Sequence, residues 1–190
     1  ACFEAAKWPC HIRLAVNLSI VQARSADLLE IVEKALLESG LEPDRLELEI
    51  TESVFLEMTA VTERNLAGLR ALGIRIALDD FGTGYSSLSY LLKLSVDKLK
   101  IDRSFIQACT EGREGRAVVD SIIQLAKTLG MIVTAEGIET EMQADYVRLQ
   151  GCHEMQGFLF SRPVSAQLVG IRIDGEREAA RPEPGLLRLA

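Results

Sequence analysis

Short apolar segments alternate with helix-length segments along most of the chain. The pattern predicts strands at 13–19, 46–51, 74–79, 96–102, 132–137 and 155–160, and helices at 27–39, 59–72, 116–129 and 140–149. Three of these helices are followed by glycine, at Gly40, Gly73 and Gly130, as is typical of helix C-termini. Strands that alternate with helices in this way indicate an α/β fold built on a parallel sheet.

Within the strands, polar and apolar side chains alternate with a period of two. Leu46, Leu48 and Ile50 share one face of the second strand, and Glu47 and Glu49 lie on the other. An open sheet covered by helices on both sides would be apolar on both faces. A barrel can instead direct its polar face inward and its apolar face toward the helices. We therefore predict a TIM-like (β/α) barrel.

The polar residues at the strand ends follow the repeat of such a barrel. Successive positions lie roughly 20–35 residues apart, close to the repeat of a (β/α)8 barrel. These barrels place their chemistry at the C-terminal ends of the strands. The residues that fall there are Asn17, Glu49, Asp79, Asp102, Glu136 and Gln156.

Several of these side chains are suited to metal-dependent chemistry. Asn17, Glu49 and Asp79 supply hard oxygen ligands of the kind that Mg²⁺ and Mn²⁺ prefer. Asp80 can join them only if the chain bends after Asp79, because adjacent strand residues point to opposite faces. The glycines of Phe81-Gly82-Thr83-Gly84 permit that bend. Two neighbouring aspartates are a familiar feature of two-metal phosphoryl chemistry.

Three further charged residues lie near the same end of the strands. Lys100 can orient water or stabilise negative charge that develops on a phosphate. Glu136 and Glu139 add carboxylates after the fifth strand. We expect the whole set to bind hard divalent ions rather than zinc, because neither Cys nor His accompanies it.

Each of these residues also has a purely structural interpretation. Asn17 can be a turn or N-cap residue, and Glu49 and Glu52 can begin a helix. Asp79-Asp80 can form a turn, and Lys100 can pair with Asp102. For any single residue the structural interpretation is as good as the functional one. Their joint occurrence at one end of successive strands favours function.

A second polar layer is expected below the strand ends. The period-two pattern places Arg13, Glu47, Arg75 and Lys98 on the inner face of the sheet. Because unpaired buried charges are costly, we expect Glu47 to pair with at least one of these cations. Removal of Glu47 alone would then destabilise the fold by about 3–5 kcal/mol.

Composition narrows the range of functions. The chain has 190 residues, 48% hydrophobic and 26% charged, with a formal net charge of −7. This charge argues against binding of DNA or RNA polymers and of anionic membranes. Four cysteines without metal-ligand spacing in a chain of this apolar content favour a reducing cytoplasm. A phosphodiester substrate would then need metal ions to neutralise it.

The chain resembles the EAL domain of cyclic di-GMP phosphodiesterases, from Val16-Asn17-Leu18-Ser19 to Phe160-Ser161-Arg162-Pro163. The most specific motif is the loop at 79–88, from Asp79-Asp80-Phe81-Gly82 onward. The other matching motifs are Glu49-Ile50-Thr51-Glu52, Lys100-Ile101-Asp102, Ala135-Glu136-Gly137-Ile138-Glu139 and Gln156-Gly157-Phe158. The resemblance implies hydrolysis of cyclic di-GMP to linear pGpG with two Mg²⁺ or Mn²⁺ ions.

The resemblance also implies a role for each matching residue. It implies Asn17, Glu49, Asp79 and Asp80 as metal ligands, Lys100 as the residue that orients the attacking water with Asp102 nearby, Glu136 and Gln156 as active-site residues, Glu52 as the anchor of the 79–88 loop, and Glu139 as a supporting carboxylate. Family members often occur in longer proteins with upstream sensor or cyclase domains, some of them bound to membranes, and can form homodimers.

The chain departs from the family at its start. The Glu-Ala-Leu motif that names the family is absent, and we identify six strands where the family has eight. We therefore expect residues 1–173 to form an EAL domain without its first two strands, with 1–8 as the helix before the third strand and 174–190 as a linker or tail. One metal ligand and some substrate contacts would be missing, so we expect the fragment alone to be inactive.

Three hypotheses about function follow. The chain belongs to a metal-dependent phosphodiesterase, to a degenerate receptor that binds cyclic di-GMP without cleaving it, or to a barrel used only for protein interaction. The downstream catalytic motifs favour the enzyme, because a receptor has no need of metal ligands.

Overall fold

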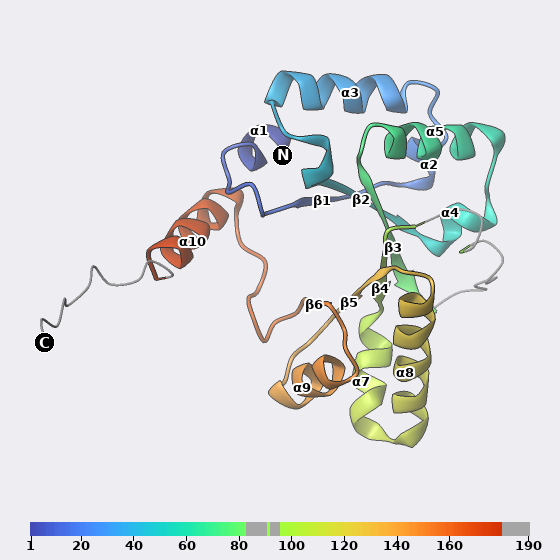
Figure 1. Ribbon diagram of the computed structural model, residues 1–190, viewed down its shortest axis with the longest axis vertical. Helices are drawn as coiled ribbons and strands as arrows, with labels where there is room; N and C mark the ends of the chain where they lie inside the picture. The colour runs from blue at the N-terminus through green and yellow to red at the C-terminus, as the bar shows by residue number, and fades with distance from the viewer. Residues whose placement is uncertain (83–90, 92–95, 180–190) are drawn as a thin grey trace, which may run out of the picture.

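The computed structural model describes residues 1–82, 91 and 96–179, and its strands form one curved parallel sheet (Figure 1). The strand order follows the sequence, β1-β2-β3-β4-β5-β6, and each strand pairs in parallel with the next. The strands are β1 (Leu14–Asn17), β2 (Leu46–Thr51), β3 (Arg75–Phe81), β4 (Lys98–Ile101), β5 (Ile132–Ala135) and β6 (Glu154–Met155). The partial TIM-like barrel predicted from the sequence is therefore confirmed.

Helices cover the outer side of this sheet. The described helices are α1 (Cys2–Ala5), α2 (Ile20–Ala23), α3 (Leu28–Ser39), α4 (Glu52–Leu56), α5 (Ala60–Ala71), α7 (Arg103–Glu111), α8 (Arg113–Thr128), α9 (Glu141–Leu149) and α10 (Ala166–Ala179). In Figure 1, α3 and α5 lie at one end of the sheet, α7 to α9 lie at the other, and α10 stands apart. No described helix is long and apolar enough to cross a membrane.

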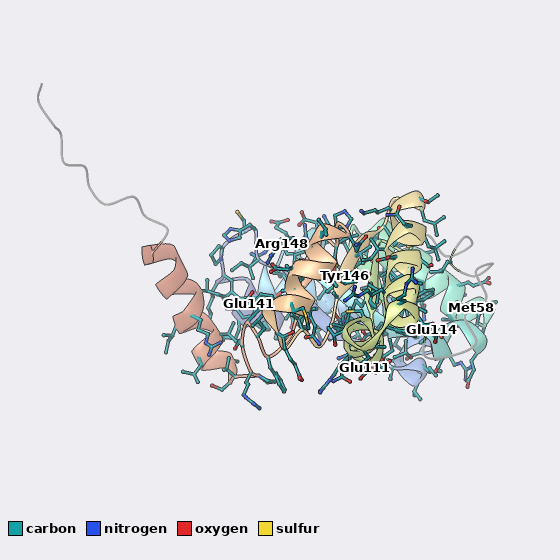
Figure 2. The ribbon with its side chains drawn as sticks, turned by 90° about the horizontal axis from the view of Figure 1, so that it is seen from below. Met58, Glu111, Glu114, Glu141, Tyr146 and Arg148 are labelled. Carbon is teal, nitrogen blue, oxygen red and sulfur yellow. The ribbon has the colours of Figure 1, made fainter. Side chains whose placement is uncertain are left out.

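The apolar strand positions form the core between the sheet and the helices. Ile50, Leu78 and Leu99 are almost completely buried and contribute to one continuous hydrophobic cluster. Burial of such side chains contributes about 1.5–3 kcal/mol each. From α9, Tyr146 lies toward α8, and its hydroxyl donates to Asp120 Oδ1 at 2.6 Å (Figure 2).

The helix boundaries agree with the sequence prediction where capping residues are present. Thr59 caps α5 and Thr140 caps α9, each accepting a backbone N–H in its first turn. Gly40 ends α3 in the left-handed conformation, with φ of 69°, as expected for a helix C-terminus. The expected helix before the first strand is α1.

The secondary-structure prediction was wrong in several places, and the helices α2, α4 and α10 are absent from it. The sixth strand was expected at 155–160 but spans only Glu154–Met155, because Gly157 begins a turn that closes with Phe160 N–H donating to its carbonyl. The helix α7 was not predicted. Gly112 separates it from α8, and at Gly115 an added Cβ would lie 2.2 Å from Ala108 O, so glycine permits the close approach of the two helices.

At the C-terminal end, α10 continues to Ala179 and so includes part of the expected tail. The remainder of that tail, 180–190, and the 83–88 part of the glycine loop lie outside the described residues.

The inner face of the sheet carries the expected lower layer of charges. Lys98 Nζ lies 2.8 Å from Glu47 Oε1 and 2.6 Å from Glu154 Oε2, so the predicted pairing of Glu47 is confirmed. Arg13 approaches Glu154 at 3.9 Å. Because Arg13 precedes β1 directly and Glu154 begins β6, this pair joins the two edges of the sheet and shows how strongly it curls. No pair with Arg75 is found among the described residues.

This arrangement changes the energetic expectation for Glu47. Lys98 keeps Glu154 as a partner when Glu47 is removed, whereas loss of Lys98 leaves two carboxylates facing each other. We predict that Lys98→Met lowers the free energy of unfolding by about 3–5 kcal/mol, and that Glu47→Gln costs less. Urea unfolding measures both changes. The control Lys34→Met removes an exposed ammonium of α3 and should cost below about 0.5 kcal/mol. Equal effects of the two lysine substitutions would contradict the assignment.

Candidate active site

The ammonium group of Lys100 lies at the centre of the upper polar layer, one layer nearer the C-terminal ends of the strands. Its Nζ is 2.8 Å from Glu49 Oε1, 3.0 Å from Asp79 Oδ1 and 2.7 Å from Glu136 Oε1. These carboxylates come from β2, from β3 and from the residue after β5. The Lys100 side chain is 5% exposed, so the ammonium exchanges nearly all of its water for carboxylate oxygens.

The charged groups of this layer shift one another's pKa values. Although burial alone would lower the pKa of Lys100, its hydrogen bonds to Glu136 and Glu49 raise that pKa above the ordinary value. Burial raises the pKa of Glu136, and its hydrogen bond to Lys100 offsets this only in part. The site therefore holds a permanently charged ammonium beside a carboxylate that takes up a proton more readily than usual.

Asp80 bends the chain inside β3, which was expected to end at Asp79 but continues to Phe81 through a shift in register between Leu78 and Phe81. Its φ of 54° lies in the left-handed region, and its N–H donates to Asp79 Oδ1 at 3.1 Å. Burial raises the pKa of Asp80, and the charges of Asp79 and Asp102 raise it further. This bend brings Asp80 to the same side as Asp79.

A carboxylate cluster that can hold a metal ion results from the bend. Carboxylate oxygens of Asp79, Asp80 and Glu136 all lie within 4.8 Å of one another. With Glu49 next to them, four carboxylates face one ammonium, and the excess of negative charge on hard oxygens fits divalent ions such as Mg²⁺ or Mn²⁺. The sequence assigned Glu136 to catalysis only, whereas the geometry also makes it a candidate metal ligand.

Glu52 lies where the loop-anchoring role requires. It is the first residue of α4 and is 8% exposed, so the structural interpretation that it begins a helix is correct. Its Oε1 accepts the N–H of Gly82 at 2.6 Å. The contact ties the start of the 79–88 loop to β2, directly after the two aspartates.

The remaining predicted residues lie around this centre. Asn17 ends β1, is exposed and stands opposite Glu49 in the strand register. Gln156 follows β6, where its N–H donates to Ala135 O, and it lines the hollow on the inner face of the sheet. Neither side chain is among the three carboxylates of the cluster.

Asp102 and Glu139 make contacts outside the cluster. Asp102 caps α7, and its Oδ1 accepts the Ser104 N–H at 2.9 Å, so the alternative of a Lys100–Asp102 ion pair is not what the structure shows. Glu139 Oε1 lies 2.9 Å from the guanidinium of Arg103. Asp102 therefore supports the backbone of α7, and Glu139 pairs with a side chain of the same helix.

The lower layer forms the floor of a hollow of about 280 Å³, and Glu154 is the member that sequence reasoning missed. Its strand was predicted to begin one residue too late. The period-two spacing from Gln156 is the signal that would have found it. Although burial raises its pKa, the hydrogen bond and charge of Lys98 lower the pKa of Glu154 overall.

Comparison with known proteins identifies relatives of this chain. A model of the family described as EAL domain matches residues 1–163. The chain is 44% identical over 154 residues to the bifunctional diguanylate cyclase/cyclic di-GMP phosphodiesterase MucR of Pseudomonas aeruginosa, over 81% of this chain and 22% of MucR. It is 42% identical to the cyclic di-GMP phosphodiesterase NbdA of the same species, over 81% of this chain and 20% of NbdA. The chain thus spans about a fifth of these relatives.

Solved structures show the same fold. The MucR phosphodiesterase in complex with cyclic di-GMP superimposes with a TM-score of 0.84 at 41% identity, covering 89% of this chain and 70% of that one. Klebsiella pneumoniae BlrP1, in a manganese/cyclic di-GMP complex, gives a TM-score of 0.78 at 34% identity, covering 85% and 42%.

The lowered pKa of Glu154 predicts a pH dependence of stability. A depressed folded-state pKa contributes stability that is present above the unfolded value, near 4.5, and lost as the pH falls through the folded value. We expect the free energy of unfolding to fall below about pH 4.5 less steeply in Glu154→Gln than in the wild type. Urea unfolding over about four pH units, from about pH 3 to about pH 7, measures how the free energy of unfolding changes with pH. Glu38→Gln, at an exposed position, is the control, and an unchanged slope in Glu154→Gln would contradict the pairing.

Proposed function

The chain belongs to the EAL domain family, and we propose that within a complete domain it hydrolyses cyclic di-GMP to linear pGpG by a two-metal mechanism. The observation that carries this proposal is the Lys100 ammonium between Glu49, Asp79 and Glu136, beside the aspartate pair at the end of β3. MucR and NbdA, which are named as cyclic di-GMP phosphodiesterases, support the choice of substrate.

We propose that Asn17, Glu49, Asp79 and Asp80 hold two Mg²⁺ or Mn²⁺ ions, with Glu136 as a further ligand. Bound there, the ions would neutralise the phosphate and activate water. All of these side chains offer oxygen, and four are carboxylates whose mutual repulsion is offset, among the described residues, by the Lys100 ammonium. The manganese complex of BlrP1 supports this class of metal.

Lys100 and Glu136 are the residues placed to assist the reaction. In the proposed step, water oxygen bonds to phosphorus, the P–O3′ bond breaks, and a proton from water reaches the departing 3′ oxygen. Lys100, whose ammonium lies among the carboxylates, orients the attacking water and offsets negative charge that develops on the phosphate. Glu136, at 2.7 Å from the Lys100 ammonium and within the carboxylate cluster, holds that ammonium in place beside the reacting phosphate. Asp102 and Gln156 act at the edge of the active site, outside the carboxylate cluster.

We propose that the chain acts as part of a longer cytoplasmic protein with sensor or cyclase domains. The two-activity name of MucR and the small share of MucR that this chain covers support further domains. The four free cysteines support a reducing compartment. We further propose that the parent protein forms a homodimer. Residues 1–173 are its phosphodiesterase domain, and any attachment of the parent protein to a membrane comes from another segment.

The metal assignment predicts the effect of one conservative substitution. In a polypeptide that carries this chain together with the first two strands of the domain, Asp79→Asn should lower the rate of cyclic di-GMP hydrolysis by more than about a hundredfold. The amide keeps the volume but weakens both metal sites. Asp27→Asn, at the exposed start of α3, is the matched control with unchanged turnover. Near-normal hydrolysis by Asp79→Asn would defeat the two-metal proposal, and nucleotide binding without turnover in the wild type would identify a receptor.

The open sheet predicts how the 190-residue chain behaves by itself. Within the described part, β1 and β6 each pair on one side only, and exposed strand edges invite association. We expect this chain to self-associate and to have negligible phosphodiesterase activity, and we expect the polypeptide with the two additional strands to be monodisperse and active. Size-exclusion chromatography and cleavage of cyclic di-GMP with Mg²⁺ or Mn²⁺ compare the two at equal concentration. Equal rates would show that the additional strands are dispensable.

A further inference from the structure

The first turn of α7 contacts the backbone next to the candidate metal ligands on two strands. Phe105 lies against Gly82, directly after the end of β3, where a Cβ added to the glycine would be 2.7 Å from the ring. Arg103 lies against Gly137, next to Glu136, where an added Cβ would be 2.3 Å from Cγ of the arginine. Both glycines have positive φ, at 97° and 67°.

Gly82 is held from both sides. On one side its N–H donates to Glu52 Oε1 at 2.6 Å, and on the other the Phe105 ring fills the space that a side chain would occupy. Two residues earlier, Asp80 has the strained φ of 54°. A residue keeps such a conformation only when its surroundings hold it there, at a cost of about 1–3 kcal/mol. Phe105 is part of those surroundings.

Arg103 holds the second strand end in a similar way. Its methylene stem packs on Gly137, and its guanidinium reaches Glu139 at 2.9 Å. The N–H of Glu139 in turn donates to Gln143 Oε1 in the cap of α9. The backbone on the C-terminal side of Glu136 is therefore fixed between α7 and α9.

The rest of α7 makes this first turn a rigid support. Asp102 caps the helix through the Ser104 N–H at 2.9 Å, and Ile106 and Cys109 are buried in the core at 0% and 1% exposure. A capped helix anchored by buried side chains does not shift without a loss of packing. The two strand ends that contact it are therefore held at a fixed separation.

We propose that Phe105 and Arg103 are positioning residues that set the distance from Asp79 and Asp80 to Glu136 and thereby the affinity of the site for divalent metal. This inference rests on the proposed function, because it deepens the assignment of the metal site. Neither residue contacts the carboxylates of the proposed ligands directly. Phe105 acts through Gly82, two residues after Asp80, and Arg103 acts through Gly137, directly after Glu136. Supporting residues of this kind change metal affinity by about 10–100-fold when they are removed.

The test compares two substitutions at each position, with the chain carried in one polypeptide together with the first two strands of the domain. Phe105→Ala removes the ring, whereas Phe105→Leu keeps much of the volume. Arg103→Ala removes the stem on Gly137, whereas Arg103→Met keeps much of the stem and removes the guanidinium with its contact to Glu139. Phe3→Ala makes the same chemical change at an exposed site on α1 and is the control. Mn²⁺ binding is followed by electron paramagnetic resonance, with circular dichroism confirming that each variant is folded.

We expect Phe105→Ala and Arg103→Ala to weaken Mn²⁺ binding by about tenfold, and Phe105→Leu, Arg103→Met and Phe3→Ala to change it by less than about threefold. Hydrogen exchange provides a readout that does not need metal. In Phe105→Ala the amides of 79–82 should exchange faster, while those of β2 keep the wild-type rate. A purely structural role would lower the stability of Phe105→Ala without this local change.

The outcomes separate this inference from the proposed function. Wild-type chain that takes up no Mn²⁺ would overturn the metal assignment and the positioning role with it. Wild-type chain that binds Mn²⁺, with unchanged affinity and unchanged exchange in folded Phe105→Ala and Arg103→Ala, would overturn the positioning role alone.

Discussion

The buried ammonium of Lys100 is the interaction on which the arrangement of the site depends. Carboxylates from β2, β3 and the end of β5 lie within 3.0 Å of its Nζ, on the inner face of a sheet whose outer face forms the core. Without this ammonium, the carboxylates would repel one another at close range in a poorly hydrated space. The lysine therefore allows the carboxylates that we propose as metal ligands to lie close together without a metal ion.

The two polar layers of the sheet differ in charge balance, and this difference is the reason that we propose the metal site in the upper one. In the lower layer, Lys98 and Arg13 face Glu47 and Glu154, so two cations meet two carboxylates. In the upper layer, carboxylates outnumber the single ammonium. Divalent cations are attracted to the layer with excess negative charge. The lower layer instead joins β2, β4 and β6 and helps to keep the sheet curled.

Backbone conformation at the strand ends matters as much as the side chains. Asp80 faces the site only because its φ is positive, and the Gly82 that follows permits both the hydrogen bond from Glu52 and the close contact with Phe105. A side chain at Gly82 would displace the ring and loosen the turn. The glycine in this motif is thus required by packing in addition to its conformational freedom.

The sequence determined the parallel α/β architecture, the inner and outer faces of the strands and most of the residues at the site. These follow from local rules, because a period of two fixes which face a side chain occupies and because parallel strands end on the same side. It also predicted that Glu47 needs a cation. It did not determine which cation, since Arg13, Arg75 and Lys98 all share that face.

Only the tertiary structure decided the contacts that depend on curvature and on approach between distant segments. Glu154 joins the lower layer because the sheet curls until β6 lies near β1, and Glu136 joins Asp79 and Asp80 because the chain turns at Asp80. The nine-residue helix α7 was not predicted, yet its first turn packs against the glycines at both strand ends. Such contacts join residues far apart in the chain, so their geometry cannot be derived from local periodicity.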